Sequence, residues 1–303
     1  MKTINTEVAG ILNVTPDSFS DGGLYIDPTK AIAHAMQMFD EGASMVDVGA
    51  ESTRPGAIAL TPKQEWLRLK LVLNELVPTY IGKISVDTYH PETICRTVKN
   101  FGSITANDVT GYNNPEMMQI TAELGIQCIV SHLPKYCEQN LQQAHADKPI
   151  DSINQVRDEL LEKREELVSA GIKPDMITVD PGVGFGKTMR TNWQLLSFAD
   201  HVPGINVMIG YSRKRFLYTD EKTGEIIPAL MSLKEFAKRD KQNGLTSSAN
   251  IDKHEAWIRE IHEYAGTIAV NAGTKLLRVH DVAFHYDLIK RLGKTRLQTA
   301  QLQ

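Results

Sequence analysis

Short apolar runs recur along this chain, and most of them are followed by a segment with helical periodicity. Runs rich in Val and Ile are typical of buried strands, whereas apolar residues three and four positions apart are typical of helices. The predicted strands are 8–14, 45–49, 83–87, 103–108, 127–132, 176–180, 206–210 and 275–280. The predicted helices are 28–41, a segment from 61, 92–100, 115–124, 150–170, about 192–199, 255–272 and 282–292.

Strands that alternate with helices predict a parallel sheet, because right-handed crossovers join neighbouring parallel strands. Eight such units close into an α/β fold of the (β/α)8 TIM barrel type, and an open doubly wound sheet is the alternative. Polar residues follow nearly every strand, which favours the barrel, since an open sheet concentrates its chemistry at one switch point. We therefore expect a single barrel domain over 1–303, with an insertion at 217–254 where the regular pattern loosens.

Composition narrows the class of protein. The net charge, 33 − 37 = −4, gives no overall basic field, so we expect no nucleic-acid partner. No apolar run approaches the ~18 residues of a membrane-spanning helix, and the first residues contain no apolar signal core. The three cysteines, Cys95, Cys128 and Cys137, have no metal-binding or redox spacing and indicate reduced thiols. These features predict a cytoplasmic protein with no membrane partner.

The densest polar segment follows the first predicted strand. It reads Asn13-Val14-Thr15-Pro16-Asp17-Ser18-Phe19-Ser20-Asp21-Gly22-Gly23. Pro16 removes a backbone donor and Gly22-Gly23 favours a loop, so the strand ends here. An ordinary surface turn uses the same residue types. Polar residues after the other strands favour a site instead, because a barrel gathers the carboxyl ends of its strands at one mouth.

One chemical set among the strand-end residues can recognise a flat heterocycle. It combines two carboxylates, an amide and an ammonium, namely Asp87, Asn107, Asp180 and Lys214. A carboxylate accepts paired hydrogen bonds from an aminopyrimidine edge, an amide both donates and accepts, and an ammonium donates to a ring carbonyl or nitrogen. Any one of the four alone is as well explained as a hydrogen-bonded strand end, but four together favour a binding site.

A second set suits a phosphate or pyrophosphate with Mg2+, which keeps several waters and takes few protein ligands. It consists of Asn13, Arg54, Arg278 and His280. For His280 alone, a structural hydrogen bond is the simpler interpretation. The run Gly182-Val183-Gly184-Phe185-Gly186-Lys187 lacks the spacing of a nucleotide-hydrolase phosphate loop, and it also lacks the dinucleotide-binding pattern.

Seven segments in order resemble the dihydropteroate synthases, a family of pterin-binding barrel enzymes. Besides the opening segment, they are Glu51-Ser52-Thr53-Arg54-Pro55-Gly56, Val86-Asp87-Thr88, Asn107-Asp108, Asp180 to Lys187, Ser212-Arg213-Lys214 and Arg278-Val279-His280-Asp281. The resemblance implies a transferase of folate biosynthesis, the target of sulfonamides. It would join 6-hydroxymethyl-7,8-dihydropterin diphosphate to p-aminobenzoate, release pyrophosphate by a dissociative substitution, and use Mg2+. A homodimer is also implied.

Carried over by position, the resemblance assigns roles to single residues. The pterin-binding residues would be Asp87, Asn107, Asp180 and Lys214. The diphosphate-binding residues would be Thr53, Arg278 and His280, with Asn13 as the metal ligand. The p-aminobenzoate-binding residues would be Phe19, Arg54, Pro55 and Ser212. Catalysis would fall to Asp17, Arg54, Lys214 and Asp87.

Two alternative functions would use the same pterin pocket. A methyltetrahydrofolate:corrinoid methyltransferase would need a cobalamin partner and no diphosphate site, which the segments 53–56 and 212–214 argue against. A non-catalytic paralogue would keep the pocket but lose loop or diphosphate residues, and all of these are present. One departure from the family pattern follows the fifth strand, where Ser131-His132-Leu133 replaces the usual Met-His-Met.

Overall fold

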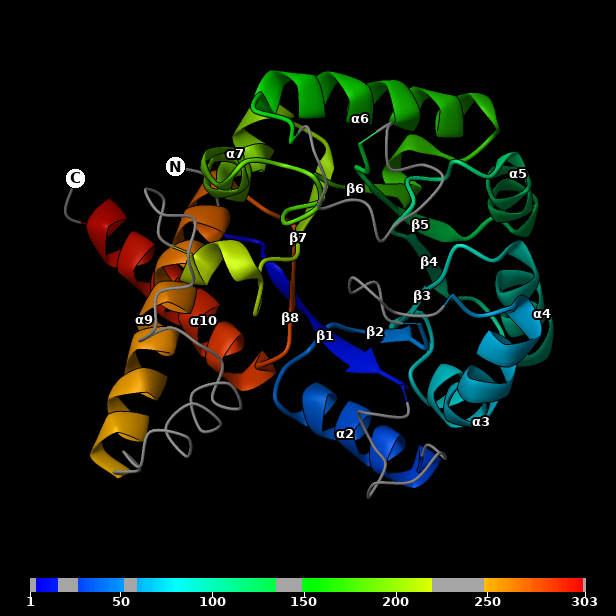
Figure 1. The fold of residues 1–303 in the computed structure, drawn as a ribbon, viewed down its shortest axis with the longest axis horizontal. Helices are drawn as coiled ribbons and strands as arrows, with labels where there is room; N and C mark the ends of the chain where they lie inside the picture. The colour runs from blue at the N-terminus through cyan, green and yellow to red at the C-terminus, as the bar shows by residue number, and fades with distance from the viewer. Residues whose placement is uncertain (1–3, 16–26, 52–58, 135–148, 220–247, 302–303) are drawn as a thin grey trace.

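The computed structural model describes residues 4–15, 27–51, 59–134, 149–219 and 248–301 (Figure 1). Its strands form a closed barrel in the order β1 to β8, and each strand pairs in parallel with its neighbours. The predicted TIM barrel is confirmed. The strands are β1 (Glu7–Asn13), β2 (Met45–Gly49), β3 (Ile84–Asp87), β4 (Thr105–Asp108), β5 (Gln127–Ser131), β6 (Ile177–Asp180), β7 (Asn206–Ile209) and β8 (Leu276–Val279).

Helices cover the outside of the barrel (Figure 1). They are α2 (Pro28–Asp40), α3 (Pro62–Thr79), α4 (Pro91–Phe101), α5 (Pro115–Leu124), α6 (Ile153–Ser169), α7 (Met189–Gln194), α9 (Ser248–Ala272) and α10 (Val282–Gln301), with 3-10 turns η3 (Pro174–Met176), η4 (Leu195–His201) and η5 (Arg215–Tyr218). The helices α2 to α5 each begin with proline, whose missing N–H would have no partner in the first turn. Within the described stretches, no helix combines the length and the apolar character needed to cross a membrane.

The strand register places polar side chains above a small apolar layer inside the barrel. Ala9, Ile129, Met208 and Leu276 form a buried cluster apart from the main core. These residues come from β1, β5, β7 and β8, so they meet inside the barrel. Side chains two apart on a strand share a face, so Arg278 points inward after Leu276. The interior of this barrel therefore changes from apolar to charged toward the carboxyl ends of the strands.

The same register directs the side chains of the residues predicted to bind a heterocycle into the barrel. Asn107 pairs with Ile129, and Asp87 pairs in turn with Asn107. Residues paired across parallel strands point to the same side of the sheet, so both polar side chains share the interior with Ile129. Asp180 pairs with Ser131, two residues beyond Ile129, and faces inward as well.

Several element bounds differ from the predicted ones. The final helix continues to Gln301 rather than ending at 292, because residues after Gly293 are good helix formers such as Lys, Arg, Leu and Gln. The predicted helix at 192–199 is divided into α7 and η4, where Ser197 has non-helical dihedral angles. The helix α9 begins at Ser248, seven residues before the predicted start. Residues 220–247 of the predicted insertion lie outside the described residues, so the insertion stays a prediction.

Candidate active site

Arg278 is the centre of a charged network inside the barrel. Its Nε lies 2.6 Å from Asp47 Oδ2, and its Nη2 lies 2.8 Å from Asp87 Oδ2. The side-chain Nδ2 of Asn107 donates to the same Asp47 oxygen at 3.0 Å. Four strands, β2, β3, β4 and β8, thus contribute to one hydrogen-bonded group. The structure brings together Asp87, Asn107 and Arg278, which the sequence analysis placed in two separate sets. Asp47 joins Asn107 to Arg278, and Arg278 in turn contacts Asp87.

Asp180 and Lys214 lie in another part of the polar layer inside the barrel, beside the loop that follows β6. Asp180 Oδ1 accepts a hydrogen bond of 2.7 Å from the backbone N–H of Gly182. Lys214 Nζ donates to the Val183 carbonyl and lies 4.7 Å from the centre of the Phe185 ring. Burial raises the pKa of Asp180 and lowers that of Lys214 to about 8, although each charge opposes the shift of the other. An acid and an ammonium are therefore held close together in a partly desolvated place.

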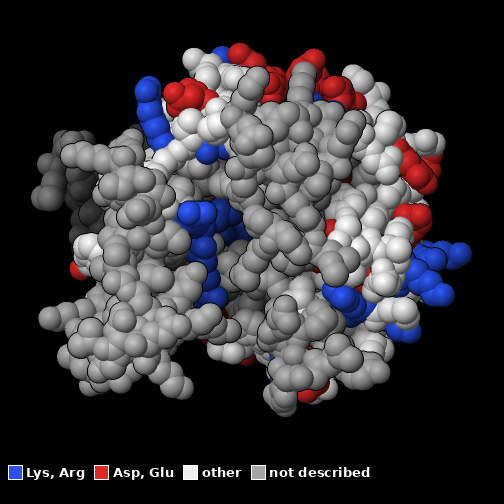
Figure 2. Space-filling view, viewed as in Figure 1, with Lys and Arg blue, Asp and Glu red and all other residues white. Residues whose placement is uncertain are grey.

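The network around Arg278 and the pair of Asp180 and Lys214 are neighbours inside the barrel. A methyl group placed on Gly210 would lie 3.7 Å from Arg278 Cβ and 3.9 Å from Asp180 Oδ2. The sequence suggested an acidic set and a separate cationic set, but Arg278 is surrounded by carboxylates. The reason is that the Arg278 side chain points into the barrel from β8 and reaches Asp47 of β2 and Asp87 of β3. Lys and Arg side chains are visible near the middle of the face in Figure 2, over the chain that follows β7.

Burial shifts the protonation of the carboxylates in this layer. It raises the pKa of Asp87 to about 7, even though the adjacent Arg278 guanidinium favours the ionised form. It also raises the pKa of the neighbouring Asp108 to about 6, against the hydrogen bonds from Thr110. Asp87 therefore changes charge near neutral pH, a property common at functional sites.

Ser212 and His280 are in direct contact. Ser212 Oγ lies 3.0 Å from His280 Nδ1 and accepts a hydrogen bond of 3.3 Å from the backbone N–H of His280. The predicted p-aminobenzoate residue and the predicted diphosphate residue thus stand at adjoining strand ends, those of β7 and β8. The residue between Ser212 and Lys214, Arg213, has a left-handed backbone with φ 58°.

His262 of α9 supports this left-handed turn. The backbone N–H of Arg213 donates to His262 Nε2 at 3.2 Å, and His262 Nδ1 lies 2.8 Å from the Ile258 carbonyl. These contacts require a neutral imidazole that donates through Nδ1 and accepts through Nε2. Burial lowers the pKa of His262, which favours that neutral form. The helix thereby fixes the turn that presents Ser212 and Lys214.

Lys187 holds the loop after β6. Its buried Nζ lies 3.3 Å from the His132 carbonyl, 3.0 Å from that of Gly182 and 2.9 Å from that of Phe185. An ammonium has three N–H donors, so these carbonyls engage all of them. Lys187 therefore holds the loop after β6 together and ties it to the chain after β5, which agrees with the prediction that this segment is not a phosphate-binding loop.

Asn13 ends β1 opposite Gly49 and is half-buried at the barrel mouth. Among the described residues, no group of three or more His, Cys, Asp or Glu side chains could hold a metal ion. The role of Asn13 as a Mg2+ ligand stays a prediction. The other predicted site residues, Asp17, Phe19, Thr53, Arg54 and Pro55, lie outside the described residues.

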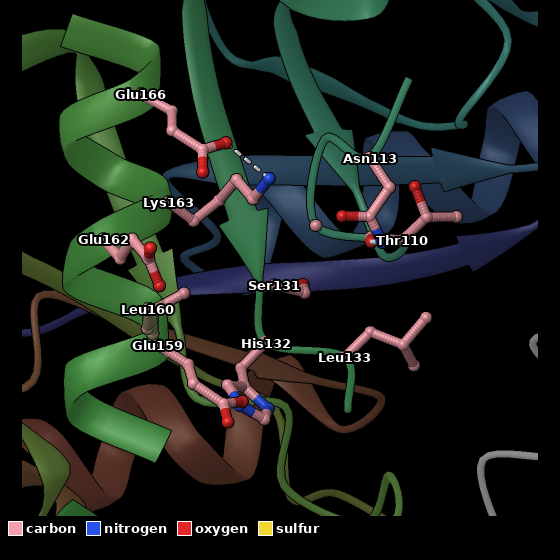
Figure 3. A pocket seen from close by; sticks show the side chains of 11 residues that line it. Thr110, Asn113, Ser131, His132, Leu133, Glu159, Leu160, Glu162, Lys163 and Glu166 are labelled. Atoms are coloured by element: carbon pink, nitrogen blue, oxygen red, sulfur yellow. Dashed lines mark hydrogen bonds and ion pairs between the residues drawn. The ribbon is translucent and has the colours of Figure 1, made fainter. Parts of the chain in front are cut away.

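A separate cavity of about 90 Å³ lies between α6 and the loops that follow β4 and β5 (Figure 3). Glu159 Oε2 lies 2.9 Å from His132 Nε2, and Lys163 pairs with Glu166 at 2.6 Å. Burial lowers the pKa of His132 to about 4, so its imidazole is neutral at physiological pH. None of the predicted site residues lines this cavity, which distinguishes it from the barrel interior.

Three residues with evident roles here were not among the predicted site residues, namely Asp47, Lys187 and His262. In the sequence, Asp47 is recognisable as a carboxylate in the middle of an apolar strand. The structure shows that it is only 1% exposed. Burying a charge costs free energy unless the charge is paired, so an ionisable residue inside an apolar strand is expected to contact a group of opposite charge. His262 carries no comparable sequence signal, because helices carry histidines for many reasons.

Comparisons with known proteins agree on one family. The model of the pterin binding enzyme family matches residues 9–280. The dihydropteroate synthase of Mycobacterium leprae is 34% identical over 97% of this chain and 94% of its own length. The fold is similar to that of Xanthomonas albilineans dihydropteroate synthase solved with 4-aminobenzoic acid, with a TM-score of 0.75 and 30% identity over 96% of this chain and 93% of that one. A structure of that enzyme with 7,8-dihydropteroate has a TM-score of 0.71 and 28% identity over 98% and 95% of the two chains.

Proposed function

The chain belongs to the pterin binding enzyme family and, within it, to the dihydropteroate synthases, and we propose that it joins 6-hydroxymethyl-7,8-dihydropterin diphosphate to p-aminobenzoate at the mouth of its barrel. It is thus a transferase of folate synthesis. The relative solved with 4-aminobenzoic acid and the one solved with 7,8-dihydropteroate support this choice of substrate and product.

The observation that carries the proposal is the polar layer inside the barrel. Asp87, Asn107 and Asp180 point inward from β3, β4 and β6, and Lys214 Nζ follows β7. A pterin has an aminopyrimidine edge with N–H donors and a ring carbonyl that accepts. Carboxylates at Asp180 and Asp87 would accept from the N–H groups, while Lys214 would donate to the ring. Arg278, next to Asp180, would take the diphosphate end.

The reaction is a substitution at the carbon between the ring and the diphosphate. The C–O bond breaks with its electron pair leaving on pyrophosphate, and the aniline nitrogen then forms the new C–N bond and loses a proton. Positive charge on that carbon can delocalise into the reduced ring, where the carboxylate of Asp180 would stabilise it. Arg278 and His280 would stabilise the negative charge on the leaving pyrophosphate. The weak nucleophile needs positioning more than activation.

We assign the Mg2+ site to Asn13 together with the diphosphate oxygens. When bound, Mg2+ would neutralise charge on the leaving group. Thr53 would bind the diphosphate, and Phe19, Arg54, Pro55 and Ser212 would enclose p-aminobenzoate. Arg54 and Asp17 would complete the catalytic set with Lys214 and Asp87. These roles come from the position of each residue in the family pattern, and for Ser212 its contact with His280 supports the assignment.

The proposed function is tested by following pyrophosphate release and dihydropteroate formation with each substrate omitted in turn. With both substrates and Mg2+, both products should form in equal amounts. With the pterin diphosphate alone, a slow release of pyrophosphate is expected, because the carbon centre then reacts with water. Absence of dihydropteroate with both substrates present would refute the function, and a trapped covalent pterin–enzyme adduct would refute the dissociative mechanism.

We also propose that the enzyme is a homodimer of the cytoplasm. Trp257 and Tyr264 are seven residues apart on α9 and are 46% and 63% exposed, which supports an interface on that helix. Cys95 and Cys128 are free thiols, which supports a reducing compartment. Light scattering at micromolar concentration would test the dimer, and a monomeric mass would exclude it. Fractionation of cells would test the location.

A further inference from the structure

We infer that Asp47 is a positioning residue, which determines the hydrogen-bonding atoms that Asn107 and Arg278 present to the substrate. This inference rests on the proposed function, because it concerns the same pterin and diphosphate. Asp47 itself is 1% exposed, lies two residues before Gly49 at the end of β2, and accepts hydrogen bonds from both Asn107 and Arg278 through its Oδ2. Its influence would pass through the two side chains that it contacts.

The first effect concerns the orientation of the Asn107 amide. An ionised carboxylate only accepts hydrogen bonds, so the amide nitrogen of Asn107 must face Asp47 Oδ2, 3.0 Å away. The amide oxygen of Asn107 then points elsewhere, and it is buried without a partner among the described residues. A buried acceptor without a donor is costly, so this oxygen is ready for an N–H group of a ligand. Asp47 thereby makes Asn107 an acceptor toward the pterin.

The second effect concerns the guanidinium of Arg278. Its Nε is engaged by Asp47 and its Nη2 by Asp87, at 2.6 and 2.8 Å. With these two nitrogens engaged, the guanidinium plane is fixed, and as far as the contacts between described residues go, Nη1 is the nitrogen left for a ligand oxygen. The two carboxylates also moderate the positive charge that Arg278 presents. Replacing Asp47 by Leu, which has no acceptor, would therefore change the two ligand ends in different ways.

At the pterin end, Asp47→Leu removes the acceptor that holds the amide nitrogen of Asn107. The Asn107 amide can then turn over, which would place its NH2 group where the substrate also has an N–H. At the diphosphate end, the same change removes one negative charge next to Arg278. Binding of pterin should weaken, while binding of an anion should hold or strengthen. A residue with a merely structural role would lower both affinities together.

The experiment is calorimetric titration of the full-length protein with 6-hydroxymethylpterin and, separately, with inorganic pyrophosphate and Mg2+. For Asp47→Leu we expect pterin affinity to fall about 10-fold or more, since the Asn107 amide is no longer held with its oxygen toward the ligand. Pyrophosphate affinity should be equal to or higher than that of the wild type. Asp108→Leu is the matched control, because Asp108 is also fully buried, but its side chain accepts hydrogen bonds from Thr110 and, unlike the adjacent Asn107, points away from the barrel interior. It should leave both affinities within about twofold.

The conservative variant Asp47→Asn gives an independent test, because its amide oxygen can still accept from Asn107 and Arg278 where Asp47 Oδ2 stood. The Asn107 amide then keeps its orientation, so the pterin affinity of Asp47→Asn should lie within about threefold of the wild type, and this measurement also stands if Asp47→Leu does not fold. Unchanged pterin affinity in Asp47→Leu, a parallel loss of both ligands in Asp47→Leu, or a loss of pterin affinity beyond about threefold in Asp47→Asn would overturn the inference. If the wild type bound neither ligand, the proposed function itself would fail.

Discussion

Replacing Gly184 by Ala is expected to displace Lys214 without unfolding the barrel. Gly184 has φ 86°, and a methyl group there would lie 2.9 Å from Lys214 Cδ. The lysine side chain is flexible, so it would move and its Nζ would leave the Val183 carbonyl. The left-handed backbone adds a cost of ~1–2 kcal/mol, which lowers Tm by roughly 2–6 °C. A hydrogen bond from a charged donor contributes ~1.5–3 kcal/mol, so pterin affinity should fall roughly 10- to 100-fold.

Gly204 provides the control for the backbone cost. Its φ is 83°, and nothing lies within 4 Å of the position a methyl group would take. Gly204→Ala should therefore lose the same few degrees of Tm and keep the wild-type affinity for 6-hydroxymethylpterin. Differential scanning calorimetry and titration of both variants would compare the two effects. Equal pterin affinity in Gly184→Ala and Gly204→Ala would show that the position of Lys214 does not matter for binding.

Further predictions follow from the charged groups of the layer. Because the pKa of Asp87 is about 7 in the folded state and ~3.9 in an unfolded chain, the folded state binds more protons between these values, and stability should fall as pH rises from 4 to 7. The decrease in urea midpoint from pH 5 to pH 8 should be smaller in Asp87→Asn; an equal decrease would contradict this shift. Lys187→Met removes one donor from each of three carbonyls and should lower the free energy of unfolding by about 3 kcal/mol in urea titrations. Lower affinity for pyrophosphate at unchanged stability would instead make Lys187 a phosphate ligand. Arg278→Met should weaken pyrophosphate binding about 10-fold and leave binding of 6-hydroxymethylpterin measurable; an equal loss of both would remove Arg278 from the diphosphate site.

The barrel was predictable from the sequence because each strand and helix is marked by a pattern within its own few residues. Each strand is a short apolar run bounded by polar residues. The helices α2 to α5 begin with proline, and capping residues such as Thr61, which forms a capping box with Gln64, mark other starts or the same ones. The inward-facing Asp87 and Asp180 were found because strand ends are marked by the loops that follow them. Helix ends were less well defined, since Gly293 was compatible with a helix end but lies inside α10.

The arrangement of charges around Arg278 was not predictable in the same way. Which carboxylate meets the guanidinium depends on the register between β1 and β8 and between β2 and β3, and this register is set by closure of the whole barrel. Asp47 had no loop or proline beside it to mark it as a strand end. The pairing of His262 with the turn at Arg213 joins residues 49 positions apart and depends on where α9 packs.

The most direct test of pterin binding by the strand ends is a titration of 6-hydroxymethylpterin into the wild type and Asp180→Asn. The variant keeps an oxygen that can accept from the Gly182 N–H, so the loop after β6 should remain in place. It replaces the other carboxylate oxygen with an NH2 group, which cannot accept from the aminopyrimidine edge. We predict that affinity falls about 100-fold, as expected for losing paired charge-assisted hydrogen bonds. Affinity within twofold of the wild type would contradict the binding of the pterin ring at these strand ends.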